Sequence, residues 1–307
     1  MENTNNVKDP ERKTTREQVN EIMEQLEKGV TELFESDKFK AYLTCMSKFH
    51  NYSLNNTLLI AMQKPDATLV AGFNAWKFKH GRTVKKGEKG IRILAPYTYK
   101  VDAETGKEPE SEDAKTVERT GFKPTSVFDI SQTEGKELPT IGVNELSGDV
   151  KDYDKLYRAL RLHCPVPVEF RDIKGGSKGF FSDSEGVVVI KSGMSQVQTI
   201  KTLVHETAHA MLHSKAAMDE GLTIDRRTME VEAESIAFTV CKKYGLDTDD
   251  YSFGYIAGWS SGKDIKELKA SLERIKDMAD KLITGLDKSI EKQTVLENAA
   301  RDYDEER

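Results

Sequence analysis

The sequence predicts an α+β protein of two domains: an N-terminal domain of helices with a small β-sheet, and a C-terminal domain with more helix. Three observations predict this. The 307 residues are enough for about two domains. Helical periodicity and strand-like runs occur in both halves of the chain. The stretch GKELPTIGVNELSGDV, residues 135–150, lies between them and leads out of the first domain.

The first domain is expected to span residues 16–145, after a polar tail at residues 1–15 that we expect to be disordered. Apolar residues recur at helical spacing in three segments, and Pro65 ends the third. Two strand-like runs follow, and the charged stretch between them, residues 98–120, is expected to be a flexible excursion from a hairpin. The helices are expected at residues 16–34, 37–49 and 53–64, and the strands at residues 90–101 and 124–132.

The second domain is expected to span residues 146–307 and to end in a long helix from residue 263 to residue 292. Its apolar residues alternate at three and four positions, which is the pattern of a heptad seam. Such a helix either docks on its own domain or pairs with a second copy, so the chain is a monomer or a coiled-coil-mediated dimer. Before it, we expect a helix at residues 153–163, strands at 166–173 and 186–192, and further helices around residues 200–212 and 226–243.

Composition limits the classes of function. The formal net charge is -6, so a nucleic acid must be bound by a local basic patch rather than by the whole surface. The three cysteines form no CxxC pair, which argues against a cysteine zinc site or a disulfide framework. The chain lacks a secretory h-region and an apolar run of roughly 18 residues, so we expect a cytoplasmic protein with no membrane partner.

The stretch His205-Glu206-Thr207-Ala208-His209 matches HExxH, a pattern expected by chance in roughly 0.01 of chains of this length. Apolar residues around it recur at helical spacing, so His205 and His209 lie one turn apart and can bind one metal ion. Glu206 projects about 100° from His205 around the helix axis. There it can reach a water molecule at the metal without being a ligand.

A zinc site with two histidines needs a third protein ligand. The segment RRTMEVEAESIAF offers Glu230, Glu232 and Glu234, and the helical wheel places Glu230 and Glu234 on its apolar face. We assign Glu230 as the third ligand and Glu234 as the residue that holds a ligating histidine, although the two roles could be exchanged. A buried ion pair with Lys or Arg is the alternative. Glu232 is expected to be solvated, and His213 to be a polar edge residue rather than a ligand.

These parts predict peptide hydrolysis with zinc as the cofactor. Glu206 would act as the catalytic base, taking a proton from the attacking water and returning it to the leaving amine. HETAH with the later Glu230-Val231-Glu232-Ala233-Glu234 resembles the gluzincin arrangement, and most of all the ImmA/IrrE family of metallopeptidases. The resemblance implies a gluzincin-like metallopeptidase domain. In this chain Ala208 replaces a common glycine, and Glu234 stands where Asp or Asn is usual.

Residues 71–93, AGFNAWKFKHGRTVKKGEKGIRI, concentrate positive charge on a chain that is acidic overall. Aromatic residues are interleaved with the cations, as in proteins that bind single strands, where cations follow the phosphates and rings stack on bases. A different interpretation places the aromatic residues in a core and leaves the lysines on a solvated hairpin. Composition alone leaves both interpretations open.

Residues 51–96 and 122–139 are similar to the N-terminal domain of ArdC-type antirestriction proteins. The resemblance implies a domain that binds single-stranded DNA, joined to a zincin-like domain. It also implies an accessory protein of mobile genetic elements that protects incoming DNA from restriction. The expected DNA contacts are Trp76, Lys77, Arg82, Lys85, Lys86 and Lys89.

Two other functions remain open at this stage. One is a regulatory protease that cuts a repressor, which would need a specific protein substrate. The other is a DNA- or protein-binding module whose zincin domain has only a structural role. The intact Glu206 favours catalysis, because a structural zinc site does not need that base.

Overall fold

The computed structural model describes residues 13–103, 105–107, 115–136, 150–218, 223–246 and 253–305. Its contacts divide the chain into two units. The first unit holds residues 1–29 and 58–136, and the second holds 30–57 and 137–307. We expected one division near residue 145, but residues 30–57 belong with the second unit. Most of the expected disordered tail lies outside the described residues.

The three helices expected near the N-terminus are confirmed to within two residues. They are α1 (Thr15–Leu33), α2 (Ser36–Phe49) and α3 (Leu54–Gln63). A capping box starts α1: the backbone N–H of Thr14 donates to Glu17, and the N–H of Glu17 donates to the Thr14 hydroxyl. Both α1 and α3 run from one unit into the other.

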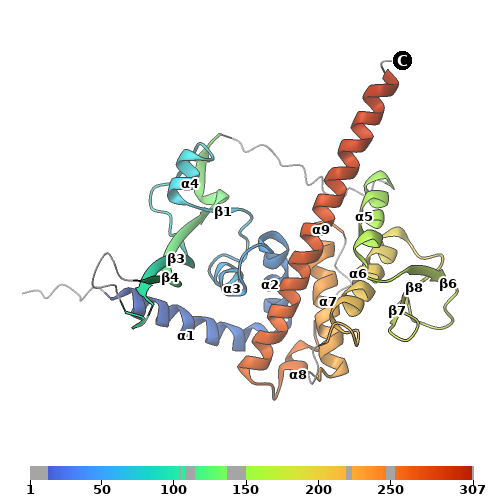
Figure 1. The fold of residues 1–307 in the computed structure, drawn as a ribbon, viewed down its shortest axis with the longest axis horizontal. Coiled ribbons are helices and arrows are strands. Elements are labelled where there is room, and N and C mark those ends of the chain that lie inside the picture. Colours follow the sequence, from blue (N-terminus) through green and yellow to red (C-terminus); the bar gives the residue numbers. More distant parts are fainter. Residues whose placement is uncertain are drawn as a thin grey trace, which may run out of the picture. The chain divides into compact units, whose positions relative to one another are not determined.

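The first unit is built on an antiparallel sheet in the order β1-β4-β3, with β1 at Val70–Gly72, β4 at Thr116–Asp129 and β3 at Ile91–Asp102 (Figure 1). The β3–β4 ladder runs from Ile91↔Val127 to Asp102↔Thr116. The strand expected at residues 90–101 is confirmed as β3. Our expectation of a flexible excursion was wrong for residues 98–102 and 116–120, which are paired strands. A backbone ladder can hold polar residues in a hairpin when their side chains face solvent. Residues 104 and 108–114 lie outside the described residues.

Two smaller elements complete this unit. The short helix α4 (Phe73–Phe78) lies against β4, and β2 (Arg82–Val84) pairs with β5 (Thr133–Gly135). Trp76 of α4 has no exposed surface, and its indole N–H donates to the carbonyl oxygen of Phe128, 2.8 Å away. Trp76 is therefore a core residue with a satisfied polar group.

The second unit places helices beside a small sheet. Its sheet has the order β6-β8-β7, with β6 at Val168–Arg171 parallel to β8 at Val187–Lys191, and β7 at Gly179–Ser182 antiparallel to it. Residues 187–190 of β8 are fully buried, as their continuous apolar run predicts. Besides α2, its helices are α5 (Val150–His163), α6 (Gln196–Leu212), α7 (Arg226–Lys243), the short α8 (Ile256–Ser260) and α9 (Ile265–Glu305). Figure 1 shows α6 and α7 side by side, with the sheet beside α6.

The long helix α9 extends 13 residues beyond the expected end at residue 292, to Glu305. Its heptad seam is buried within the chain, from Leu268 through Leu286, against α7 and α5. The seam is thus occupied by the helix's own domain, which was the first of our two interpretations. Within the described residues, no helix combines the length and the apolar character needed to cross a bilayer.

Replacing Trp76 by alanine tests its place in the core. We expect a loss of about 3–5 kcal/mol in the free energy of unfolding, because the change leaves a large cavity and an unpaired carbonyl oxygen. Urea unfolding of the full chain, followed by circular dichroism, measures this loss. An unchanged unfolding midpoint would contradict the core assignment.

Candidate metal centre

The first half of the candidate site is the helix α6. Its N-cap is Ser195, whose hydroxyl accepts from the backbone N–H of Gln198. Ile200, Leu203, Val204 and Ala208 are buried and fix the rotation of the helix. That rotation places His205 and His209 at the same edge, with side chains 20% and 14% exposed.

The second half is α7, which lies against α6 and begins at the N-cap Asp225. Glu230 reaches across from α7 to both histidines. One of its carboxylate oxygens lies 3.5 Å from Nε2 of His205 and 3.7 Å from Nε2 of His209. The two Nε2 atoms are 3.1 Å apart. The structure therefore brings together the three residues that the sequence suggested as ligands.

These distances fit a tetrahedral divalent cation. Zinc lies about 2.0–2.1 Å from nitrogen or carboxylate ligands, so two tetrahedral ligands are about 3.3 Å apart. The three observed separations, 3.1, 3.5 and 3.7 Å, scatter around that value. The histidines hold the pKa of Glu230 well below its ordinary value by hydrogen bonding to its carboxylate. The donor set is thus preformed as two nitrogens and one charged oxygen.

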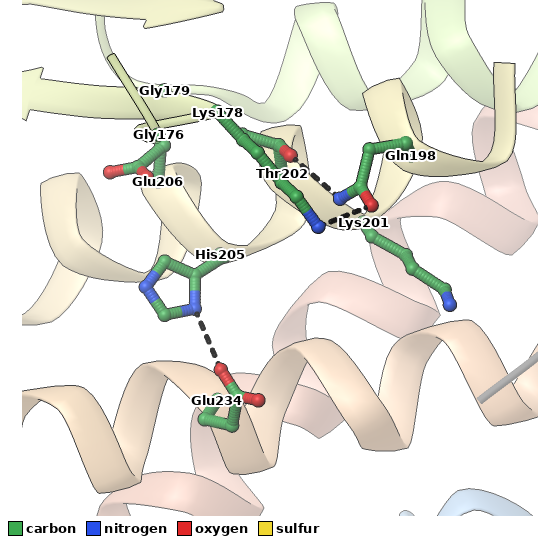
Figure 2. A pocket seen from close by; sticks show the side chains of 9 residues that line it. All are labelled: Gly176, Lys178, Gly179, Gln198, Lys201, Thr202, His205, Glu206 and Glu234. Carbon is green, nitrogen blue, oxygen red and sulfur yellow. Dashed lines mark hydrogen bonds and ion pairs between the residues drawn. The ribbon is translucent and has the colours of Figure 1, made fainter. Parts of the chain in front are cut away.

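Glu234 lies one turn further along α7, on the other nitrogen of the first histidine. Its carboxylate is 3.6 Å from Nδ1 of His205. Figure 2 marks this contact with a dashed line. That position suits a residue that orients His205 while Nε2 faces the metal. The helical wheel placed Glu230 and Glu234 on a buried apolar face, and this prediction was wrong. Their side chains are 50% and 32% exposed.

Glu232 was expected to be solvated, and this expectation was wrong. Its side chain has no exposed surface. It accepts hydrogen bonds from Ser271 at 2.7 Å, from Arg274 at 3.0 Å and from His213 at 3.0 Å. Burial alone would raise the pKa of Glu232, but these bonds outweigh it and hold the pKa below its ordinary value. The reason for the error is that α9 covers the side of α7 that we took to face water.

His213 is also part of the site's interior, with a side chain only 3% exposed. Its Nδ1 lies 3.0 Å from Nδ1 of His209. The ionised Glu232 can only accept, so Nε2 of His213 carries the proton that it donates. Nδ1 of a neutral His213 then accepts, and Nδ1 of His209 must donate. This series of hydrogen bonds leaves the lone pair of His209 Nε2 facing Glu230 and the metal position.

Glu206 lines a cavity of about 360 Å³ next to His205, and Figure 2 shows both side chains from α6 with Glu234 opposite them on α7. The exposed fraction of Glu206 is 7%. Burial raises the pKa of Glu206, while His205 and His209 act in the opposite direction. A carboxylate with a raised pKa beside a cavity is suited to accept and return a proton.

The sequence did not predict the wall of this cavity that comes from β7 and the loop before it. The wall is lined by Gly176, Lys178 and Gly179, and α6 adds Gln198, Lys201 and Thr202. A Cβ at Gly179 would lie 2.6 Å from the Thr202 side chain and 2.8 Å from the Val189 carbonyl oxygen. Only glycine lets β7 approach α6 this closely. The glycines of GGSKGF were the available sign of a close backbone approach. The strand β7 itself has four residues, too few for its alternation to be recognised in the sequence.

The six residues expected to contact DNA have different environments. Trp76 is buried, so no face of its ring is available to a base. The guanidinium of Arg82 donates to the hydroxyl and carbonyl oxygens of Thr133 and closes β2 onto β5. Lys85 donates to the Ser131 carbonyl oxygen. The remaining three side chains are on exposed residues: Lys77, Lys86 and Lys89.

Comparisons with known proteins match both parts of the chain. Residues 12–128 match the family model described as the N-terminal domain of anti-restriction factor ArdC, and residues 164–244 match Peptidase_M78, the IrrE N-terminal-like domain. An uncharacterized protein of Bacillus anthracis is 29% identical over 312 residues, which cover 90% of this chain and 52% of the relative. The chain thus spans about half the length of that curated relative.

One solved structure shows the same fold. The metal-free crystal structure of the antirestriction ArdC protein from the R388 plasmid is 18% identical, with a TM-score of 0.51. The alignment covers 78% of this chain and 86% of that one. The Mn(II)-bound crystal structure of the same protein has a TM-score of 0.48 at 18% identity, over 78% of this chain and 85% of that one.

Replacing Glu232 by alanine should be far more damaging than replacing Glu230. The first change leaves Arg274 and His213 without their buried partner, so we expect a loss of about 3–5 kcal/mol in the free energy of unfolding. Glu230→Ala removes a half-exposed carboxylate, and we expect less than about 1 kcal/mol. Urea unfolding with a chelator present measures both values. Equal losses would contradict the role given to Glu232.

Proposed function

Since this chain joins an ArdC-type N-terminal domain to an IrrE-like domain of the Peptidase_M78 type, we propose that it binds single-stranded DNA and hydrolyses peptide bonds. The observation that carries the peptidase proposal is the triangle of donor atoms from His205, His209 and Glu230, with Glu206 beside it. We further propose an antirestriction role on a mobile genetic element, with a protein substrate still to be identified.

We propose zinc as the metal. Two imidazoles and one carboxylate are the ligand set of catalytic zinc sites that keep a position open for substrate or water. When bound, the ion supplies Lewis-acid polarisation of the scissile carbonyl group. The same nitrogen and oxygen donors also accept manganese or cobalt, so the bound metal is a matter for direct measurement.

The chain's own residues then move the proton. Glu206 accepts a proton from the attacking water as the water oxygen forms a bond to the carbonyl carbon. Glu206 returns that proton to the leaving nitrogen as the C–N bond breaks. Burial in the cavity raises the pKa of Glu206, which makes its carboxylate a stronger base toward the attacking water. Glu234 and the His213–Glu232 chain hold the two histidines in place.

The DNA-binding part of the proposal rests on the ArdC-type domain and on its exposed cations. Lys77, Lys86 and Lys89 lie on exposed residues of the first unit, where they can follow a phosphate backbone. We retain these three as proposed DNA contacts. Trp76, Arg82 and Lys85 are set aside because their side chains donate hydrogen bonds within the fold.

Replacing Glu206 by glutamine tests the peptidase proposal. We expect hydrolysis of a quenched fluorescent peptide library to fall by a factor of about 100 or more, because the proton carrier is lost. The metal content, measured by mass spectrometry after dialysis, should stay at the wild-type value. By contrast, alanine at a ligand position should remove both the activity and the metal; the three variants are His205→Ala, His209→Ala and Glu230→Ala.

Two further results would change the proposal. Wild-type metal content in Glu230→Ala would move the third ligand to Glu234. An unchanged antirestriction effect in Glu206→Gln would leave the metal domain a structural role, whereas its loss would show that peptide cleavage is required.

Charge reversal tests the DNA contacts. We expect Lys86→Glu/Lys89→Glu to weaken the binding of a labelled single-stranded oligonucleotide to the full chain, and to make that binding less sensitive to salt. Fluorescence anisotropy at several salt concentrations measures both effects. Lys276→Glu, a change on α9 in the second unit, serves as the control and should leave binding unchanged. The loss of affinity in both variants would point to a general charge effect.

A further inference from the structure

The outer part of the β3–β4 hairpin exposes aromatic residues. Tyr97 and Tyr99 of β3 are 40% and 41% exposed, and Phe122 of β4 is 52% exposed. Aromatic side chains are normally buried or used in binding, because exposed rings lose the free energy that burial provides. These rings therefore need an explanation that the metal centre does not supply.

The strand register divides the residues between two faces. Tyr97 lies opposite Gly121, Tyr99 opposite Arg119, and Ala95 opposite Lys123. Directly paired residues point to the same side of a sheet, so both tyrosines and both cations share one face. We call this the tyrosine face: Ala95, Tyr97, Tyr99, Arg119, Gly121 and Lys123. The opposite face carries Phe122 together with Lys100, Glu118 and Asp102.

The Tyr97 ring packs on the backbone of β4 at Gly121, which has no side chain. A Cβ at Gly121 would lie 2.8 Å from Cζ of the Tyr97 ring, which is closer than atoms can approach. The ring therefore rests on the backbone of β4 and turns its other side outward. The Tyr99 ring lies beside it, with centroids 5.7 Å apart and planes at 34°. The result is two neighbouring rings that each present a surface to solvent.

The charge on this face is positive. Nζ of Lys123 lies 5.9 Å from the centroid of the Tyr97 ring, and Arg119 stands opposite Tyr99. Within the described part of the chain, neither cation forms an ion pair with a carboxylate. From Ala95 to Val101 and from Val117 to Thr125, the face holds no acidic residue. Exposed rings with cations beside them form the combination that binds single strands.

We propose that the tyrosine face is a binding surface for single-stranded DNA. Bases stack on Tyr97 and Tyr99, while Arg119 and Lys123 lie near the phosphates. A duplex is excluded from this mode, because its bases already stack on one another. The inference rests on the proposed DNA-binding function and adds a surface separate from Lys86 and Lys89.

The test compares two leucine variants of the full chain by anisotropy with a labelled single-stranded oligonucleotide. Tyr97→Leu/Tyr99→Leu removes the rings of the tyrosine face, and Phe122→Leu removes a ring of similar exposure from the opposite face. We expect the first variant to bind at least about 10-fold more weakly and the second to bind like the wild type. The salt dependence should stay unchanged in the tyrosine variant, since no charge is removed.

A second variant separates stacking from charge. Arg119→Gln/Lys123→Gln should weaken binding and also reduce the slope of log affinity against log salt by roughly 0.7 per lost phosphate contact. Circular dichroism of each variant checks that the hairpin still folds. Duplex DNA should bind the tyrosine variant and the Phe122 variant with equal affinity, because its bases do not stack on the tyrosine rings.

The outcomes distinguish the two levels of the proposal. If the wild-type chain does not bind the oligonucleotide at low salt, the DNA-binding function itself is wrong. If the wild type binds and the tyrosine variant binds equally well, the function stands and the tyrosine face is wrong. Equal losses in the tyrosine and Phe122 variants would also overturn the inference, because they would reflect the hairpin's stability rather than a face.

Discussion

The carboxylate of Glu232 is the interaction on which the second unit depends. It has no exposed surface, and it joins α7 to Arg274 and Ser271 of α9 and to His213, the C-cap of α6. A buried charge is costly unless every oxygen is satisfied, so the three helices must meet in one arrangement. The same carboxylate fixes the proton on His213 and thereby the orientation of His209. The packing of the helices and the geometry of the metal ligands are thus parts of one network.

HExxH could be predicted from the sequence because its geometry is local: residues four apart on any helix share a side. The roles of the three glutamates could not be predicted in the same way. Almost every residue from Val231 to Cys241 is buried, apart from Glu234. A helix enclosed on nearly all sides has no solvent face for a helical wheel to find. Glu232 could be recognised as buried only once α9, more than 30 residues later, was known to cover it.

The first unit shows a similar limit. The composition of residues 71–93 indicated cations and aromatic residues, but it could not show which of them the fold itself uses. Trp76 fills the core, and Arg82 holds β5. Meanwhile the tyrosines lay at the edge of a segment that we expected to be a loop, because charged residues there hid the alternation of a hairpin. Strand pairing depends on partners distant in sequence, which a single stretch does not reveal.

The assignment of α2 to the second unit affects how the protein is made. It packs on α7: Met46 contacts Thr239, and Nζ of Lys40 lies over the Phe238 ring. About 180 residues separate the two helices, so at 5–20 residues per second α7 leaves the ribosome roughly ten to forty seconds after α2. During that interval the nascent chain carries an uncovered apolar helix. Translation speed and chaperones that shield apolar segments should therefore influence the yield of this protein.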